Sequence, residues 1–190
     1  MWWSRWFRKS TPEERGNRRA DALAQYLDET RRCRTDSEFA AELPKMFQGK
    51  ALEEAWRRYD VFSLWCAHQA LRTAVQERPI LMEWLIHLLE VAIRNMASSG
   101  EIEPIQLVMD RMSDFERAFN TTTPYCPGAT PAASAVYYLS KEAWNFVFPI
   151  LPSFFTNISL LEGREGLIVA PSDLLLDYIR IAKRIFGSVE

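Results

Sequence analysis

The chain has 190 residues, of which 48% are hydrophobic and 13% aromatic, and its formal net charge at pH 7 is −2. This length suits one domain, and the apolar content is sufficient for a core, which excludes an intrinsically disordered protein. The nearly neutral charge argues against a dedicated nucleic-acid-binding protein, since such proteins usually carry a large basic excess. Three widely spaced cysteines make no CxxC pair, so we expect a reducing, cytoplasmic location without a secretory signal or a membrane span.

The first ten residues form an aromatic and basic segment, which we separate from a single helical domain over residues 11–190. If residues 2–9 are helical, the aromatic side chains gather on one side and the basic ones tend to the other. This pattern is typical of helices at an anionic membrane surface, but two turns would bind weakly. Docking on the domain itself or on a second copy is the favoured alternative. The membrane or docking segment consists of Trp2, Trp3, Trp6, Phe7, Arg5, Arg8 and Lys9.

Capping signals and apolar periodicity predict a mainly α-helical domain. Thr11 and Glu14 form a capping box around Pro12, which suits the first helical position. Thr35 with Glu38 repeats this pattern. The helix after Pro79 is apolar nearly all round, so we expect it at the centre of the domain. In chain order, the expected helices run over residues 12–32, 35–44, 50–77, 79–97, 104–119, 132–145 and 173–186.

One short β-hairpin is expected before the last helix. The sequence ISLL-EGREG-LIVA places two apolar runs around a charged turn bounded by glycines at residues 162–166. Ser172 and Asp173 then predict the cap of the last helix. The expected fold class is therefore mainly α, a single-domain, bundle-like array of about six to eight helices with one short hairpin near the C-terminus.

The stretch of residues 118–161 contains two charged residues among 44, Lys141 and Glu142, although a quarter of the chain is charged. Burial in the core is the simplest interpretation, but the prolines and uncharged polar residues imply some surface. An uncharged, aromatic-lined surface suits a partner or ligand, with the long loop 120–131 as its rim. The predicted partner-binding residues are Phe148, Ile150, Leu151, Phe154, Phe155 and Tyr125.

A polar stripe crosses the apolar helix over residues 80–96. It consists of Glu83, His87, Glu90 and Arg94, which helical spacing places on one side. Imidazole and carboxylate groups can bind metal or transfer protons, but the chain has one other histidine, His68, and no HExxH motif. We therefore interpret the stripe as a solvated or ion-paired face, and we expect no cofactor, metal or catalytic residue.

The sequence also lacks the glycine-rich phosphate loops and the GxSxG motif of common enzyme classes. The leading hypothesis is a non-enzymatic protein-binding module that uses the uncharged aromatic surface as an adaptor, regulator or inhibitor. One alternative is a peripheral membrane protein or binder of an apolar ligand, anchored by the N-terminal tryptophans. A second is an enzyme with an acid–base or metal site on the helix over residues 80–96. The expected partner is a protein; a second copy and an anionic membrane surface are further candidates, and nucleic acid is not expected.

Overall fold

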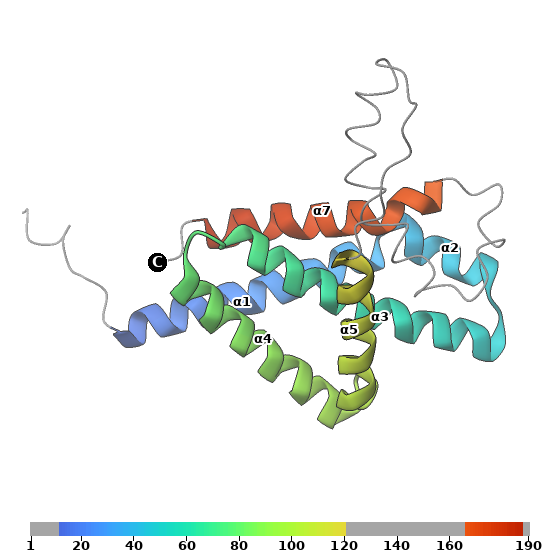
Figure 1. The fold of residues 1–190 in the computed structure, drawn as a ribbon, viewed down its shortest axis with the longest axis horizontal. Coiled ribbons are helices and arrows are strands. Elements are labelled where there is room, and N and C mark those ends of the chain that lie inside the picture. The colour runs from blue at the N-terminus through green and yellow to red at the C-terminus, as the bar shows by residue number, and fades with distance from the viewer. Residues whose placement is uncertain (1–11, 121–165, 188–190) are drawn as a thin grey trace, which may run out of the picture.

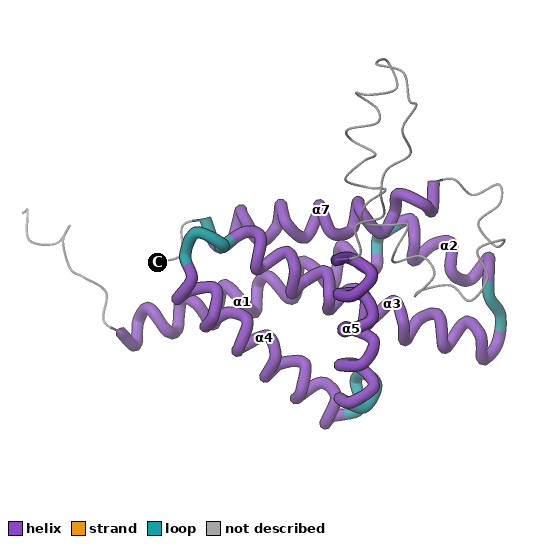
Figure 2. The backbone as a smooth tube through the Cα atoms, viewed as in Figure 1, coloured by secondary structure: helices purple, strands orange, loops and turns teal. Residues whose placement is uncertain are grey.

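Residues 12–120 and 166–187 are described by the structure, a computed structural model, and within these ranges the fold is built from six helices without a strand. This confirms the expected mainly helical fold class for the described part of the chain. None of these helices is both long enough and apolar enough to cross a membrane. The helices, shown in Figures 1 and 2, are α1 (Pro12–Thr35), α2 (Glu38–Met46), α3 (Gly49–Ala74), α4 (Pro79–Ser99), α5 (Ile105–Asn120) and α7 (Gly166–Phe186).

Local capping chemistry sets several helix ends. Ser37, and not Thr35, caps α2, because the Ser37 hydroxyl accepts a hydrogen bond of 3.1 Å from the backbone N–H of Ala40. Thr35 instead belongs to the last turn of α1, where its hydroxyl donates to the Arg31 carbonyl at 2.8 Å. At the end of α4, Gly100 adopts φ +79°, a left-handed conformation that glycine takes without the strain a side chain would add.

The predicted hairpin is wrong in the segment that the structure describes. Residues 167–170, expected as its second strand, form the start of α7, which begins at Gly166 and not at Ser172. Pro171, which separates this apolar run from the rest in the sequence, lies inside the helix. The run therefore continues the helix that carries Leu174 and Tyr178, and a short apolar run has no periodicity that distinguishes a strand from a buried helical turn.

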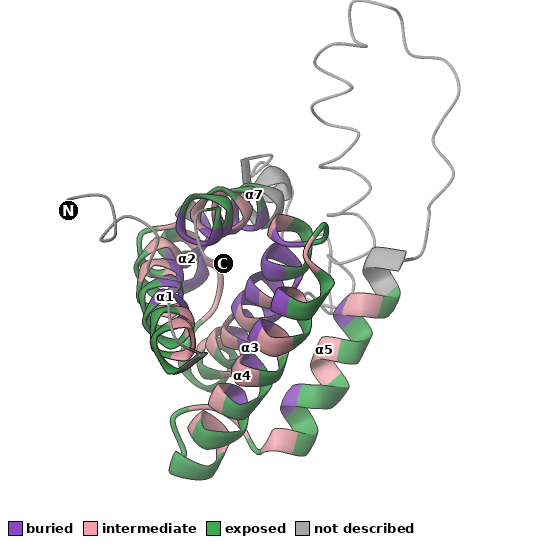
Figure 3. Cartoon of the chain, turned by 90° about the vertical axis from the view of Figure 1, so that its left-hand side faces the viewer, coloured by how far each residue is buried: buried purple, intermediate pink, exposed green. Residues whose placement is uncertain are grey.

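The centre of the fold is α3, which contacts each of the other five described helices. Figure 3 shows α1, α2 and α7 on one side of α3 and α5 on the other. The expectation that the helix over residues 79–97 would be central is wrong. Although α4 is apolar overall, it buries only one stripe, Leu81, Leu85, Leu89 and Ile93, whereas α3 buries residues on several sides. Apolar content alone does not determine burial. The C-terminal half of α3 has apolar side chains on several sides, so more helices pack on α3 than on α4.

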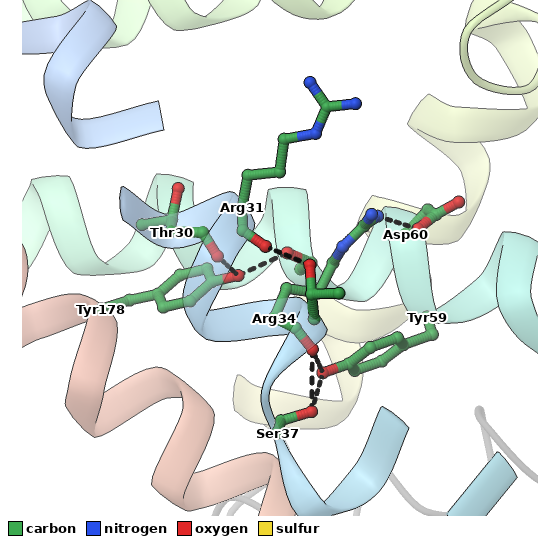
Figure 4. Close-up of polar contacts among 9 residues, drawn as sticks. Thr30, Arg31, Arg34, Ser37, Tyr59, Asp60 and Tyr178 are labelled. Atoms are coloured by element: carbon green, nitrogen blue, oxygen red, sulfur yellow. Dashed lines mark hydrogen bonds and ion pairs between the residues drawn. The ribbon is translucent and has the colours of Figure 1, made fainter. Parts of the chain in front are cut away.

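Buried tyrosine hydroxyls connect the helices around α3. Tyr178 of α7 is fully buried, and its hydroxyl lies 2.9 Å from the carbonyl of Thr30 in α1 and 2.6 Å from the hydroxyl of Ser63 in α3 (Figure 4). Tyr26 of α1, also fully buried, donates to the Ala67 carbonyl of α3 at 2.9 Å. Each hydroxyl is thus satisfied inside the core, where an unpaired polar group would be costly.

The C-terminal end of α1 is held by a third tyrosine, Tyr59 of α3. The Arg34 carbonyl lies in the last turn of α1, where intrahelical partners are missing. It accepts hydrogen bonds from the hydroxyls of Tyr59 at 3.1 Å and Ser37 at 2.9 Å, and those two hydroxyls are 2.6 Å apart (Figure 4). The turn from α1 into α2 is therefore fastened to α3.

Helix α5 is fixed to α3 by two sets of polar contacts. Near the middle of α5, the Arg111 guanidinium lies 2.7 Å from the Glu54 carboxylate of α3 and 3.1 Å from the Glu103 carboxylate. Near its end, Glu116 accepts hydrogen bonds from Gln69 and from the indole N–H of Trp65, the latter at 3.1 Å. The side chains of Val108 and Phe115 on the same helix are buried against the core.

Removing the Tyr178 hydroxyl tests this arrangement. We expect Tyr178→Phe to lower the free energy of unfolding by about 1–3 kcal/mol, because Ser63 loses its buried partner and Thr30 loses one donor. Urea unfolding followed by circular dichroism measures the change. Leu176→Ala, at an exposed position of the same helix, is the control and should have a smaller effect. Equal stability of Tyr178→Phe and the wild type would show that these hydrogen bonds contribute no net stability.

Candidate functional site

Two sets of sequence-predicted site residues lie outside the described residues. The membrane or docking set is Trp2, Trp3, Arg5, Trp6, Phe7, Arg8 and Lys9, and the partner-binding set is Tyr125, Phe148, Ile150, Leu151, Phe154 and Phe155. The third set, the polar stripe, lies on α4. All four of its side chains, Glu83, His87, Glu90 and Arg94, are exposed on the side opposite the buried leucines. Nowhere in residues 12–120 and 166–187 do three His, Cys, Asp or Glu side chains gather as they would around a metal ion.

The thiols and phenols of the described helices are held in unreactive states. Burial raises the pKa of Cys66, which is fully buried, and burial followed by nearby carboxylates raises that of Cys33. A thiol with a raised pKa is mostly protonated at neutral pH and is a weak nucleophile. Burial likewise raises the pKa of Tyr26, Tyr59 and Tyr178. The three phenols make hydrogen bonds between helices, and both thiols favour the protonated form.

Among the described residues, one opening of about 440 Å³ lies between α1 and the end of α4, with α3 as its floor. We name it the α1–α4 cleft. The two helices meet near their N-terminal halves, where the Arg19 guanidinium carbon is 5.7 Å from the centre of the Trp84 ring, and they diverge from there (Figure 1). The cleft is lined by Ala24, Leu27, Asp28, Thr30, Arg31, Arg34, Asp60, Ser63, Leu64, Ala67, Met96, Glu101 and Ile102.

The α1–α4 cleft has an apolar floor and a charged rim. Leu27, Leu64 and Met96 are half-buried and supply much of the apolar surface. On the rim, Arg34 forms an ion pair with Asp60. Burial nevertheless raises the pKa of the Asp60 carboxyl, because it outweighs the attraction of Arg34 and, more weakly, of Arg31. An apolar groove bordered by charges of both signs is suited to an amphipathic segment.

Arg31 is the rim residue most available to a ligand. Its side chain is exposed and forms neither a hydrogen bond nor an ion pair with any residue that the structure describes. Figure 4 shows its guanidinium group directed away from the contacts that join Arg34, Asp60 and Tyr59. The acidic residues Asp28 and Glu101 of the rim already have partners. The Asp28 carboxylate lies 3.4 Å from the Arg32 guanidinium, and the Glu101 carboxylate accepts a hydrogen bond of 2.8 Å from the Ser99 hydroxyl. A bound carboxylate would therefore meet Arg31 without breaking an existing pair.

A smaller opening of about 260 Å³ lies on the other side of α4, between α4 and α5. It brings together His68 of α3, Glu90 and Arg94 of the polar stripe, and the side chains of Met109 and Met112. Glu116 in its wall already accepts hydrogen bonds from α3. Burial, followed by the positive charge of Arg72, lowers the pKa of His68, so this imidazole favours its neutral form.

Sequence reasoning did not find the residues of the α1–α4 cleft. The available signal was a cluster of positive charge near the end of the first helix, Arg31, Arg32 and Arg34, but it could equally be a solvated face. No protein-family model matches the sequence, and no curated protein or solved structure is significantly similar to it. The assignment of this site therefore depends on the geometry of its own lining residues.

The lowered pKa of His68 predicts a pH dependence of stability. The unfolded chain, with an imidazole pKa of about 6.5, binds a proton more readily than the folded protein, so stability must fall as the pH drops below that value. We expect His68→Gln to flatten the dependence of the unfolding free energy between about pH 5 and pH 7.5. Urea unfolding at several pH values measures it, with His87→Gln as the control for removing a histidine. An unchanged slope in His68→Gln would contradict the assignment.

Proposed function

We propose that this protein is a non-enzymatic protein-binding module, acting as an adaptor, regulator or inhibitor, and that its α1–α4 cleft receives an amphipathic helix of the partner. The observation that carries this proposal is the combination of an apolar floor with the exposed Arg31 on the rim. Partner helices commonly dock in such grooves through apolar residues spaced three or four positions apart.

The dimensions of the cleft support a helix as the occupant. A volume of about 440 Å³ accommodates a few large side chains, and the walls contributed by α1 and α4 diverge toward one end. Apolar partner residues would pack on Leu27, Leu64 and Met96, while an acidic residue beside them would pair with Arg31. The partner segment we propose is therefore amphipathic and carries at least one Asp or Glu next to its apolar stripe.

The uncharged aromatic residues in the range 148–155 are proposed as an additional contact with the same partner. An aromatic cluster of that kind would supply the apolar anchors typical of protein interfaces. The proposal includes a cytoplasmic location and excludes nucleic acid as a ligand, on the grounds of the cysteine pattern and the nearly neutral charge. Among the described residues, the protonated thiols and the exposed stripe of α4 give less support to an enzyme.

Charge reversal at the cleft tests this proposal. The tagged full-length protein is isolated from its own cells, and co-purifying proteins are quantified by mass spectrometry. We expect one stoichiometric protein partner, and we expect Arg31→Glu to reduce its capture by about tenfold because a partner carboxylate would be repelled. Arg18→Glu is the matched control, since this arginine of the same helix is exposed and does not line the cleft. Its capture should equal that of the wild type.

Three outcomes would contradict the proposal. Absence of any stoichiometric protein would oppose the binding-module function itself. Equal capture by Arg31→Glu and Arg18→Glu would oppose the cleft as the site. Undiminished capture after Phe154→Ser with Phe155→Ser would remove the aromatic segment as the additional contact, provided circular dichroism shows that the variant remains folded.

A further inference from the structure

The outer face of α4 carries unpaired charge together with exposed apolar side chains. We define this face by the exposed residues Ile80, Glu83, His87, Glu90, Val91 and Arg94, which lie opposite the buried stripe of the same helix. The Ile80 side chain is 78% exposed, the highest value among the large apolar residues that stand out from the described helices. None of the four polar side chains forms a hydrogen bond or ion pair with a residue of the described part of the chain.

The charges along this face complement those of a second α4 that runs in the opposite direction. Acidic Glu83 and basic Arg94 stand at equal distances from a point between residues 88 and 89, and so do His87 and Glu90. A second α4, running antiparallel about a two-fold axis through that point, places Glu83 opposite Arg94 of the second copy. It also places His87 opposite Glu90 of the second copy. Each pair occurs twice, as an isologous contact requires.

Exposed apolar side chains flank these charges. Ile80 and Val91 lie beside Glu83 and His87 on this face and are 78% and 38% exposed. Pairing would bury apolar surface along a helix of 21 residues, about 31 Å in length at 1.5 Å per residue. A parallel arrangement has no such match, because it sets each charge against its own kind.

From this pattern we infer that the protein associates with a second copy of itself through antiparallel packing of the two α4 outer faces. A second copy is the occupant because its α4, in the antiparallel orientation, presents a basic residue opposite each acidic one. The contact is small and partly ionic, so the dimer is weak, concentration-dependent and weakened by salt. It is separate from the α1–α4 cleft, which draws on the α4 residue Met96 and not on the outer face.

A charge-exchange experiment on the full-length protein tests this inference. Sedimentation velocity at low ionic strength, up to about 100 µM protein, should show the wild type moving from 22.1 kDa toward twice that mass. Glu83→Arg alone and Arg94→Glu alone should each weaken the dimer by about tenfold, because each places like charges together in two symmetric pairs. The double variant, which exchanges both charges, should restore the dimerisation constant to within about threefold.

Exposed residues on another helix provide the matched controls. Glu53→Arg, Arg57→Glu and their combination make the same charge changes on the surface of α3, and they should leave the association unchanged. Restoration by the double α4 variant supports the antiparallel register. A wild type that stays monomeric overturns the inference, and so do single reversals without effect or a double variant that fails to restore the dimer. Because this readout needs no other protein, it is independent of the partner-capture experiment.

Discussion

The position of α7 is the constraint on which the rest of the fold depends. Its Tyr178 hydroxyl joins the backbone of α1 to a side chain of α3, and its Phe186 ring packs edge-on against Tyr26, with 5.7 Å between ring centres. A buried hydroxyl is tolerated only where partners meet it, so the three helices must keep one arrangement. Apolar packing alone would allow them to slide, whereas these directional contacts fix their register.

With α1, α2 and α7 on one side of α3 and α5 on the other, α4 packs on α3 between α1 and α5. Helix α4 has more apolar residues than its single buried stripe can use, and an opening lies on each of its sides over α3. The same arrangement thus gives the chain two candidate surfaces. One is the α1–α4 cleft with Arg31 on its rim, and the other is the outer face of α4, whose charges complement those of an antiparallel copy. Both follow from α3, and not α4, being central.

Local signals in the sequence were sufficient for helix ends where one residue dictates the backbone, as Pro79 and Gly100 do for α4. They failed where tertiary context decides, since an isolated apolar run such as residues 167–170 suits a strand or a helix equally well. The cleft was not predictable because its walls come from three helices and its character depends on how α1 and α4 diverge. Likewise, only the folded chain reveals that the Arg31 side chain is exposed without a hydrogen bond or ion pair among the described residues, while Arg34 pairs with Asp60.

The contact between Tyr178 and Thr30 spans 148 positions of the chain. During synthesis the first helices therefore leave the ribosome long before α7 can reach them, and until then the polar groups of α1 and α3 that face it remain hydrated or unpaired. Long-range closure of this kind slows folding, and incomplete chains expose apolar surface in the interval. Chains interrupted before α7 should therefore depend on chaperones, although five of the described helices have already been made.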